Sequence, residues 1–110
     1  VSTDDNSGSD IRAFLELTGG ASLAFVGTNG VTGDGFSTEA QAEVDTKRAL
    51  LEGAREKIIV TDPSKFGLRQ SRIFSPLEGI EILTAGDGYE HVLDDFATMI
   101  DAAGGRLTCV

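Results

Sequence analysis

The sequence is poor in cysteine and in long apolar runs, and each shortage excludes a class of protein. A single cysteine, Cys109, cannot form an internal disulfide or a metal site built from several cysteines. Its apolar surroundings near the C-terminus predict a buried thiol. No apolar run approaches the roughly 20 residues that span a bilayer, and no basic-then-apolar signal segment is present. We therefore expect a cytoplasmic protein without membrane contact.

Basic residues are also few. Eighteen acidic residues against nine basic ones give a formal net charge of -9. Such a surface repels phosphate backbones, and the sequence contains no basic helix-turn-helix pattern, zinc-finger spacing or aromatic-basic stripe. We expect that these 110 residues do not themselves bind DNA.

The residues that usually build catalytic or metal sites lack partners. His91 follows Glu90 near the start of a predicted helix, with no cysteine and no second histidine placed to complete a metal site or a triad. The bland interpretation, a histidine that faces solvent, is preferred, and the serines have no partner for nucleophilic catalysis. We expect no catalytic residue, no metal and no cofactor.

The rest of the chain predicts one compact domain. Residues 1–9 are rich in Ser, Asp, Asn and Gly and predict a disordered tail, so the domain covers residues 10–110. Three glycines between Asn29 and Gly35 predict a loop. Thr38 and Gln41 have capping-box spacing and predict the start of a helix. The predicted helices cover 10–17, 38–54 and 87–103, and the predicted strands cover 23–27, 57–61, 72–74, 80–85 and 106–110.

This alternation predicts an α/β fold, a mostly parallel sheet flanked by helices. The continuous apolar run at 23–27 predicts a strand that is buried on both faces. Ligands of open parallel sheets bind beyond the carboxyl ends of the strands. Polar loops follow three of the predicted strands, at Thr28-Asn29-Gly30, at 61–65 and at Gly86-Asp87, so we expect all three at one edge.

Two short patterns have both a functional and a purely structural interpretation. In Asp62-x-Ser64-Lys65, the lysine can meet a phosphate or carboxylate, whereas the bland alternative is an Asp-Pro turn with a solvated lysine. Glu43 and Lys47 have the spacing of a surface ion pair on a helix. Because both lie close to the apolar stripe of that helix, it stays open whether they point toward the sheet edge. The Gly-rich loop lacks a dinucleotide or P-loop fingerprint.

Four blocks of sequence, in this order and spacing, resemble the C-terminal sensor domain of the DeoR family of bacterial repressors of sugar metabolism. The blocks are AFVGTNGV (Ala24–Val31), TEAQAEVDTKRALLEGA (Thr38–Ala54), TDPSKFG (Thr61–Gly67) and IFSPLEGIEILTAG (Ile73–Gly86). The resemblance implies a fold similar to ribose-5-phosphate isomerases and the wider sugar-isomerase/CoA-transferase group. It also implies a phosphorylated sugar as effector, with operator DNA bound only through an N-terminal winged helix-turn-helix that is absent here.

The resemblance also assigns candidate site residues. Asn29 stands where the family often has Asp, and this difference favours sensing over catalysis. The family's helix and strand-end motifs fall on Glu43 and Lys47 and on the Asp62 segment. The candidate effector contacts are Thr28, Asn29, Gly30, Glu43, Lys47, Asp62, Ser64 and Lys65.

The family's phosphate-binding D-x-G-T-T loop is missing, so the chain resembles a sensor domain truncated at its N-terminal side. An exposed sheet edge would then remain, and we expect a homo-oligomer. Two alternatives stay open: a sugar-phosphate isomerase with Glu43 or Asp62 as the base, and a dimerisation module with a vestigial pocket.

Overall fold

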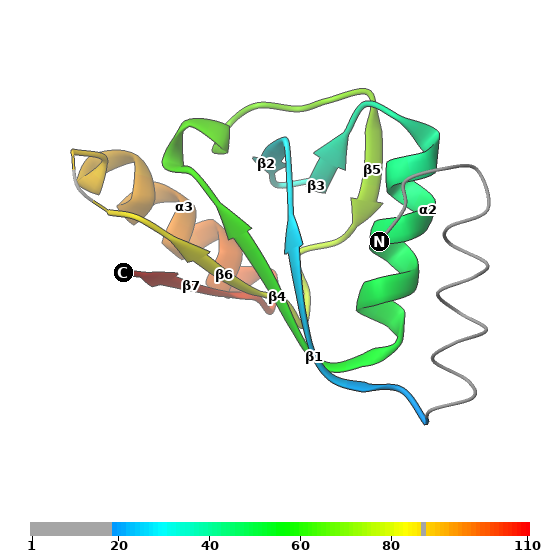
Figure 1. Ribbon diagram of the computed structural model, residues 1–110. Helices are drawn as coiled ribbons and strands as arrows, with labels where there is room; N and C mark the ends of the chain where they lie inside the picture. Colours follow the sequence, from blue (N-terminus) through cyan, green and yellow to red (C-terminus); the bar gives the residue numbers. More distant parts are fainter. Residues whose placement is uncertain (1–18, 87) are drawn as a thin grey trace.

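The computed structural model describes residues 19–86 and 88–110. The predicted tail, the predicted helix at 10–17 and Asp87 lie outside this part. The described residues form two sheets and two α-helices (Figure 1). The larger sheet is parallel and has the strand order β1 (Ala21–Gly27), β4 (Ala54–Thr61), β6 (Glu81–Thr84) and β7 (Arg106–Cys109). The prediction of an α/β fold with a parallel sheet is confirmed.

The register of this sheet brings the ends of its strands together. Gly27 of β1 pairs with Val60 of β4, and Thr61 of β4 pairs with Thr84 of β6. Because these strands run the same way, their carboxyl ends share one edge, as predicted. The β-branched run Ile58-Ile59-Val60 favours an extended backbone at the centre of the sheet.

A second, antiparallel sheet begins in the segment predicted as a loop and includes the strand predicted at 72–74. It consists of β2 (Gly30–Thr32), β3 (Gly35–Thr38) and β5 (Arg72–Ser75). The loop prediction for residues 29–35 is therefore wrong, because two of its glycines serve close packing. A Cβ on Gly30 would overlap the carbonyl oxygen of Leu68, and a Cβ on Gly35 would overlap that of Ser75.

The helices are shorter than predicted. Helix α2 covers Gln41–Glu52 and helix α3 covers Glu90–Ala102. Thr38 is the last residue of β3, and the N-cap of α2 is Ala40, which makes no side-chain cap. The capping box at Thr38 is thus wrong, because the Thr38 hydroxyl is used in another contact described below.

Leu93 and Ile100 are the buried residues of α3, and Phe96 and Met99 pack partly buried against the core. Val92 of the same helix is exposed. Cys109 was predicted to be buried and is exposed, because it lies at the end of the edge strand β7.

Both helices and the second sheet lie on one face of the parallel sheet (Figure 1). Val26, Ile59 and Ile82 on that face join the core with Phe36 and Phe74, whose rings are 6.1 Å apart.

The opposite face of the sheet remains open in the described chain. On that face, Leu23 is 40% exposed, Phe25 58% and Val60 47%. The first strand was predicted to be buried on both faces. In the part of the chain that the structure describes, one of these faces is exposed, so this prediction is wrong. The apolar run shows that side chains on both faces of the strand are apolar. It does not show whether another element packs against the second face.

Within the same described residues, no helix is long and apolar enough to cross a membrane.

Candidate functional site

Polar side chains from the loop after β1, from β3 and from α2 meet at the carboxyl end of β1. We call these residues, Asn29, Thr38, Glu43 and Lys47, the β1 cluster. Thr38 is fully buried, and its hydroxyl lies 2.7 Å from Glu43 Oε2 and 3.0 Å from Asn29 Oδ1. Helix α2 begins directly after β3, and this short connection places the first-turn residue Glu43 over the strand end. The contact joins the loop after β1 to helix α2.

Lys47 lies one turn further along α2 and points back to the same strand. Its Nζ donates a 2.7 Å hydrogen bond to the carbonyl oxygen of Gly27 and lies 5.2 Å from the centroid of the Phe74 ring. Partial burial lowers the pKa of Lys47, and the nearby Glu43 carboxylate opposes this shift. Glu43 and Lys47 therefore both turn toward the sheet edge, which resolves the alternative that the sequence left open.

Two of the sequence-predicted residues, Thr28 and Gly30, face the interior. The buried Thr28 hydroxyl lies 2.9 Å from the carbonyl oxygen of Gly30 and 3.2 Å from that of Ser37. Gly30 is also buried and leaves no room for a side chain. In this geometry both residues hold the backbone around the β1 cluster.

The segment after β4, which we call the β4 turn, consists of Asp62 and the 3₁₀-helix Pro63–Lys65. Asp62 Oδ1 accepts a 2.9 Å hydrogen bond from the backbone N–H of Ser64. This bond is the largest cause of the lowered pKa of Asp62; the Ser64 side chain and the charge of Lys65 lower it further, and slight desolvation opposes them. The Asp-Pro turn is thus present. No described residue forms a hydrogen bond with the ammonium group of Lys65, which is available to a ligand.

The hairpin of β2 and β3 follows β1 and forms hydrogen bonds with the loop after β4. We call this connection between the ends of β1 and β4 the frame. The backbone N–H of Gly67 donates to the carbonyl oxygen of Val31 at 2.8 Å, and that of Gln70 donates to Ser37 Oγ at 2.9 Å. An exposed ion pair between Arg69 and Asp34, at 3.0 Å, adds a further link. These contacts couple the loop after β4 to the hairpin, whose last residue is Thr38.

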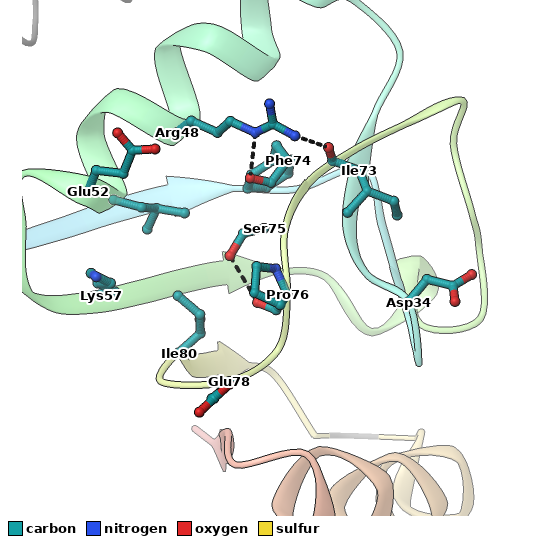
Figure 2. Close-up of a pocket in the computed structure, with 11 residues that line it drawn as sticks. Asp34, Arg48, Glu52, Lys57, Ile73, Phe74, Ser75, Pro76, Glu78 and Ile80 are labelled. Atoms are coloured by element: carbon teal, nitrogen blue, oxygen red, sulfur yellow. Dashed lines mark hydrogen bonds between the residues drawn. The ribbon is translucent and has the colours of Figure 1, made fainter.

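A separate cavity of about 450 Å³, the α2 cavity, lies between α2, β5, Lys57 of β4 and the segment 76–80 that leads into β6. Figure 2 shows Arg48 at its upper side, donating from Nε to the carbonyl oxygen of Phe74 at 3.2 Å and from Nη2 to that of Ile73 at 3.0 Å. Lys57 lines it from β4. None of the eight sequence-predicted residues lines this cavity.

Sequence reasoning missed Thr38, which was interpreted as a helix cap. A threonine three residues before a glutamine has the spacing of a capping box, whereas the use of Thr38 here depends on the hairpin, which the sequence did not predict. Within residues 19–86 and 88–110, no group of three or more His, Cys, Asp or Glu could hold a metal ion.

Comparison with known proteins agrees with the sequence blocks. A search of curated proteins and of solved structures found no significant match. The family model of the DeoR C-terminal sensor domain, by contrast, matches residues 7–86, which include β1 to β6, both strand ends and helix α2. The chain therefore belongs to the DeoR C-terminal sensor domain family, whose members are the sensing part of DeoR-type transcriptional regulators.

Proposed function

We propose that this chain senses a phosphorylated sugar, which binds across the β1 cluster and the β4 turn, and that it does so within a regulator of sugar metabolism. The observation that carries the proposal is the convergence of Asn29, Glu43 and Lys47 on the carboxyl end of β1. The β4 turn follows the neighbouring parallel strand. Open parallel sheets bind their ligands at this edge.

The chemistry of the two strand ends suits the two halves of such a ligand. Carboxylate and amide groups of Glu43 and Asn29 can bind sugar hydroxyls. The Lys65 ammonium and the exposed hydroxyl of Ser64 can bind a phosphate. The sugar would then lie over β1 with its phosphate toward β4.

The proposal assigns sensing and not catalysis. Glu43 accepts a hydrogen bond from Thr38 and Asp62 accepts one from its own turn, which supports a binding role for both carboxylates. The amide at Asn29 cannot serve as a base. An assay of aldose–ketose interconversion by the complete protein tests this point, since turnover would support the isomerase alternative.

The remaining parts of the proposal concern context. We infer a cytoplasmic homo-oligomer with the fold of the sugar-isomerase/CoA-transferase group, which reaches operator DNA through a winged helix-turn-helix. Effector binding would favour one arrangement of subunits and so change operator affinity. The edge strand β1, which has β4 as its neighbour in the described part of the chain, supports further pairing.

The experiment compares Lys65→Ala with Lys57→Ala in the complete regulator, by calorimetry against a panel of sugar phosphates. Lys57 lines the α2 cavity and is the matched control. A charge-assisted hydrogen bond contributes about 1.5–3 kcal/mol, so Lys65→Ala should weaken binding by roughly ten-fold or more.

Lys57→Ala should leave that affinity unchanged, and both variants should keep operator affinity in the absence of effector. Weaker binding of the sugar phosphate by Lys57→Ala alone would contradict the proposal. If the wild-type regulator binds none of the panel, the dimerisation module becomes the better account.

A further inference from the structure

The Thr38 hydroxyl can donate only one hydrogen bond, but two side chains lie within hydrogen-bonding distance of it. It lies within hydrogen-bonding distance of Glu43 Oε2 at 2.7 Å and of the Asn29 side-chain amide at 3.0 Å. A hydroxyl donates one proton and accepts through its lone pairs. An ionised carboxylate can only accept, so the proton of Thr38 belongs to Glu43.

Asn29 must then donate to Thr38. Amide oxygen and nitrogen are assigned from the hydrogen-bond network, and here the network requires Nδ2 of Asn29 to face the Thr38 hydroxyl. The amide oxygen consequently faces away from Thr38, and Asn29 is an exposed residue. Glu43 likewise keeps one carboxylate oxygen that Thr38 does not use.

We propose that Thr38 is a positioning residue that presents the Asn29 amide oxygen and one Glu43 oxygen to the effector as a pair of hydrogen-bond acceptors. A pair of acceptors selects a group that donates twice, which in a sugar phosphate is an adjacent pair of free hydroxyls. A phosphate or carboxylate placed there would meet two acceptors and be rejected. The inference rests on the proposed function for the identity of the ligand, but not for the role of Thr38.

Burial makes this arrangement stable against water. Thr38 is fully buried and Glu43 is half-buried, so water does not compete freely for the hydroxyl. Thr38 is also fixed by its strand, since it pairs with Arg72 of β5 at the end of the second sheet. The second sheet therefore fixes the backbone of Thr38 beside Glu43 and Asn29.

The first test uses the ligand-free chain and side-chain amide hydrogen exchange, measured by NMR. Wild type and Thr38→Ser should each show a protected Asn29 side-chain proton. Thr38→Val, which has the same shape without the hydroxyl, should lose that protection by ten-fold or more. Equal exchange in wild type and Thr38→Val would overturn the positioning role.

A measurement on the wild type covers the case in which Thr38→Val does not fold. Proton–proton contacts between the Asn29 amide group and the Thr38 side chain are expected in the nuclear Overhauser spectrum. Their absence would overturn the assigned orientation.

The second test uses sugar phosphates and their deoxy analogues, which lack one hydroxyl of the pair. The wild type should bind a deoxy analogue at least ten-fold more weakly than the parent, whereas Thr38→Val should discriminate less. Equal discrimination by both proteins would overturn the selection of a hydroxyl pair. If no sugar phosphate binds, the proposed function and the hydroxyl pair both fail, while the exchange experiment still decides the role of Thr38.

Discussion

The carboxyl ends of β1 and β4 and the α2 cavity use their polar side chains in different ways. At the strand ends, Asn29 of the loop after β1 and Glu43 and Lys47 of α2 converge on one place. In the α2 cavity, Arg48 gives two of its N–H groups to backbone carbonyls of β5, and so serves to hold helix and strand together.

This difference shows that a recess and a binding site need not coincide. The α2 cavity has the volume of about 450 Å³, but its lining mixes Arg48 and Lys57 with acidic and apolar residues in no common pattern. The strand ends have the more convergent chemistry. We assign the site by the convergence of donors and acceptors, which orients a ligand, and not by volume.

The largest expected effect comes from breaking the frame that joins the two strand ends. In Gly30→Ala, the added Cβ would overlap the backbone carbonyl of Leu68 and lie 2.6 Å from Ser37 Oγ. Since the backbone carbonyl cannot rotate away, we expect a loss of about 2–3 kcal/mol in the free energy of unfolding. Urea denaturation measures this loss.

Gly27→Ala is the matched control for that variant. Gly27 ends the same strand, β1, and a Cβ there meets no atom within 4 Å. Its stability should stay unchanged or rise by up to about 1 kcal/mol, because glycine is unfavourable inside a strand. Similar losses in both variants would show that the close packing at Gly30 is not what holds the frame.

A smaller effect is expected at Lys47 of the β1 cluster. Burial lowers its pKa in the folded protein below the ordinary value of 10.5, so the unfolded chain binds more protons between these two values. The free energy of unfolding should therefore rise with pH over that window, as the folded protein loses the cost of a desolvated charge.

Lys47→Met keeps much of the stem and removes the charge. The rise in stability toward pH 10.5 should be smaller in this variant than in wild type, as measured by urea denaturation at a series of pH values. Parallel curves for the two proteins would contradict the desolvation of Lys47.

The sequence was sufficient to predict β1, α2, β4, β6, α3 and β7 because each has a clear apolar period or a β-branched run. It was insufficient for the hairpin of β2 and β3, since Gly30 and Gly35 look like loop residues until Leu68 and Ser75 are seen packed against them. The exposure of Phe25 could not be predicted either, because an apolar pattern does not show whether another layer covers that face of the sheet.

For the candidate site, strand direction allowed the ends of β1 and β4 to be placed at one edge. The family pattern singled out Glu43 and Lys47, whose contacts with Thr38 and Gly27 now give them a common direction. Thr28 and Gly30 share that strand end but face inward, since side chains alternate along an extended chain. Thr38 could not be recognised without the tertiary contact.

The central claim is that a sugar phosphate binds at the carboxyl ends of β1 and β4 and not in the α2 cavity. Backbone chemical shifts of the complete protein, followed by NMR during titration with a sugar phosphate that binds, test it most directly. The largest changes should fall on Asn29, Glu43 and the β4 turn. Changes confined to Arg48, Lys57 and the segment around Pro76 would place the ligand in the α2 cavity and contradict the claim.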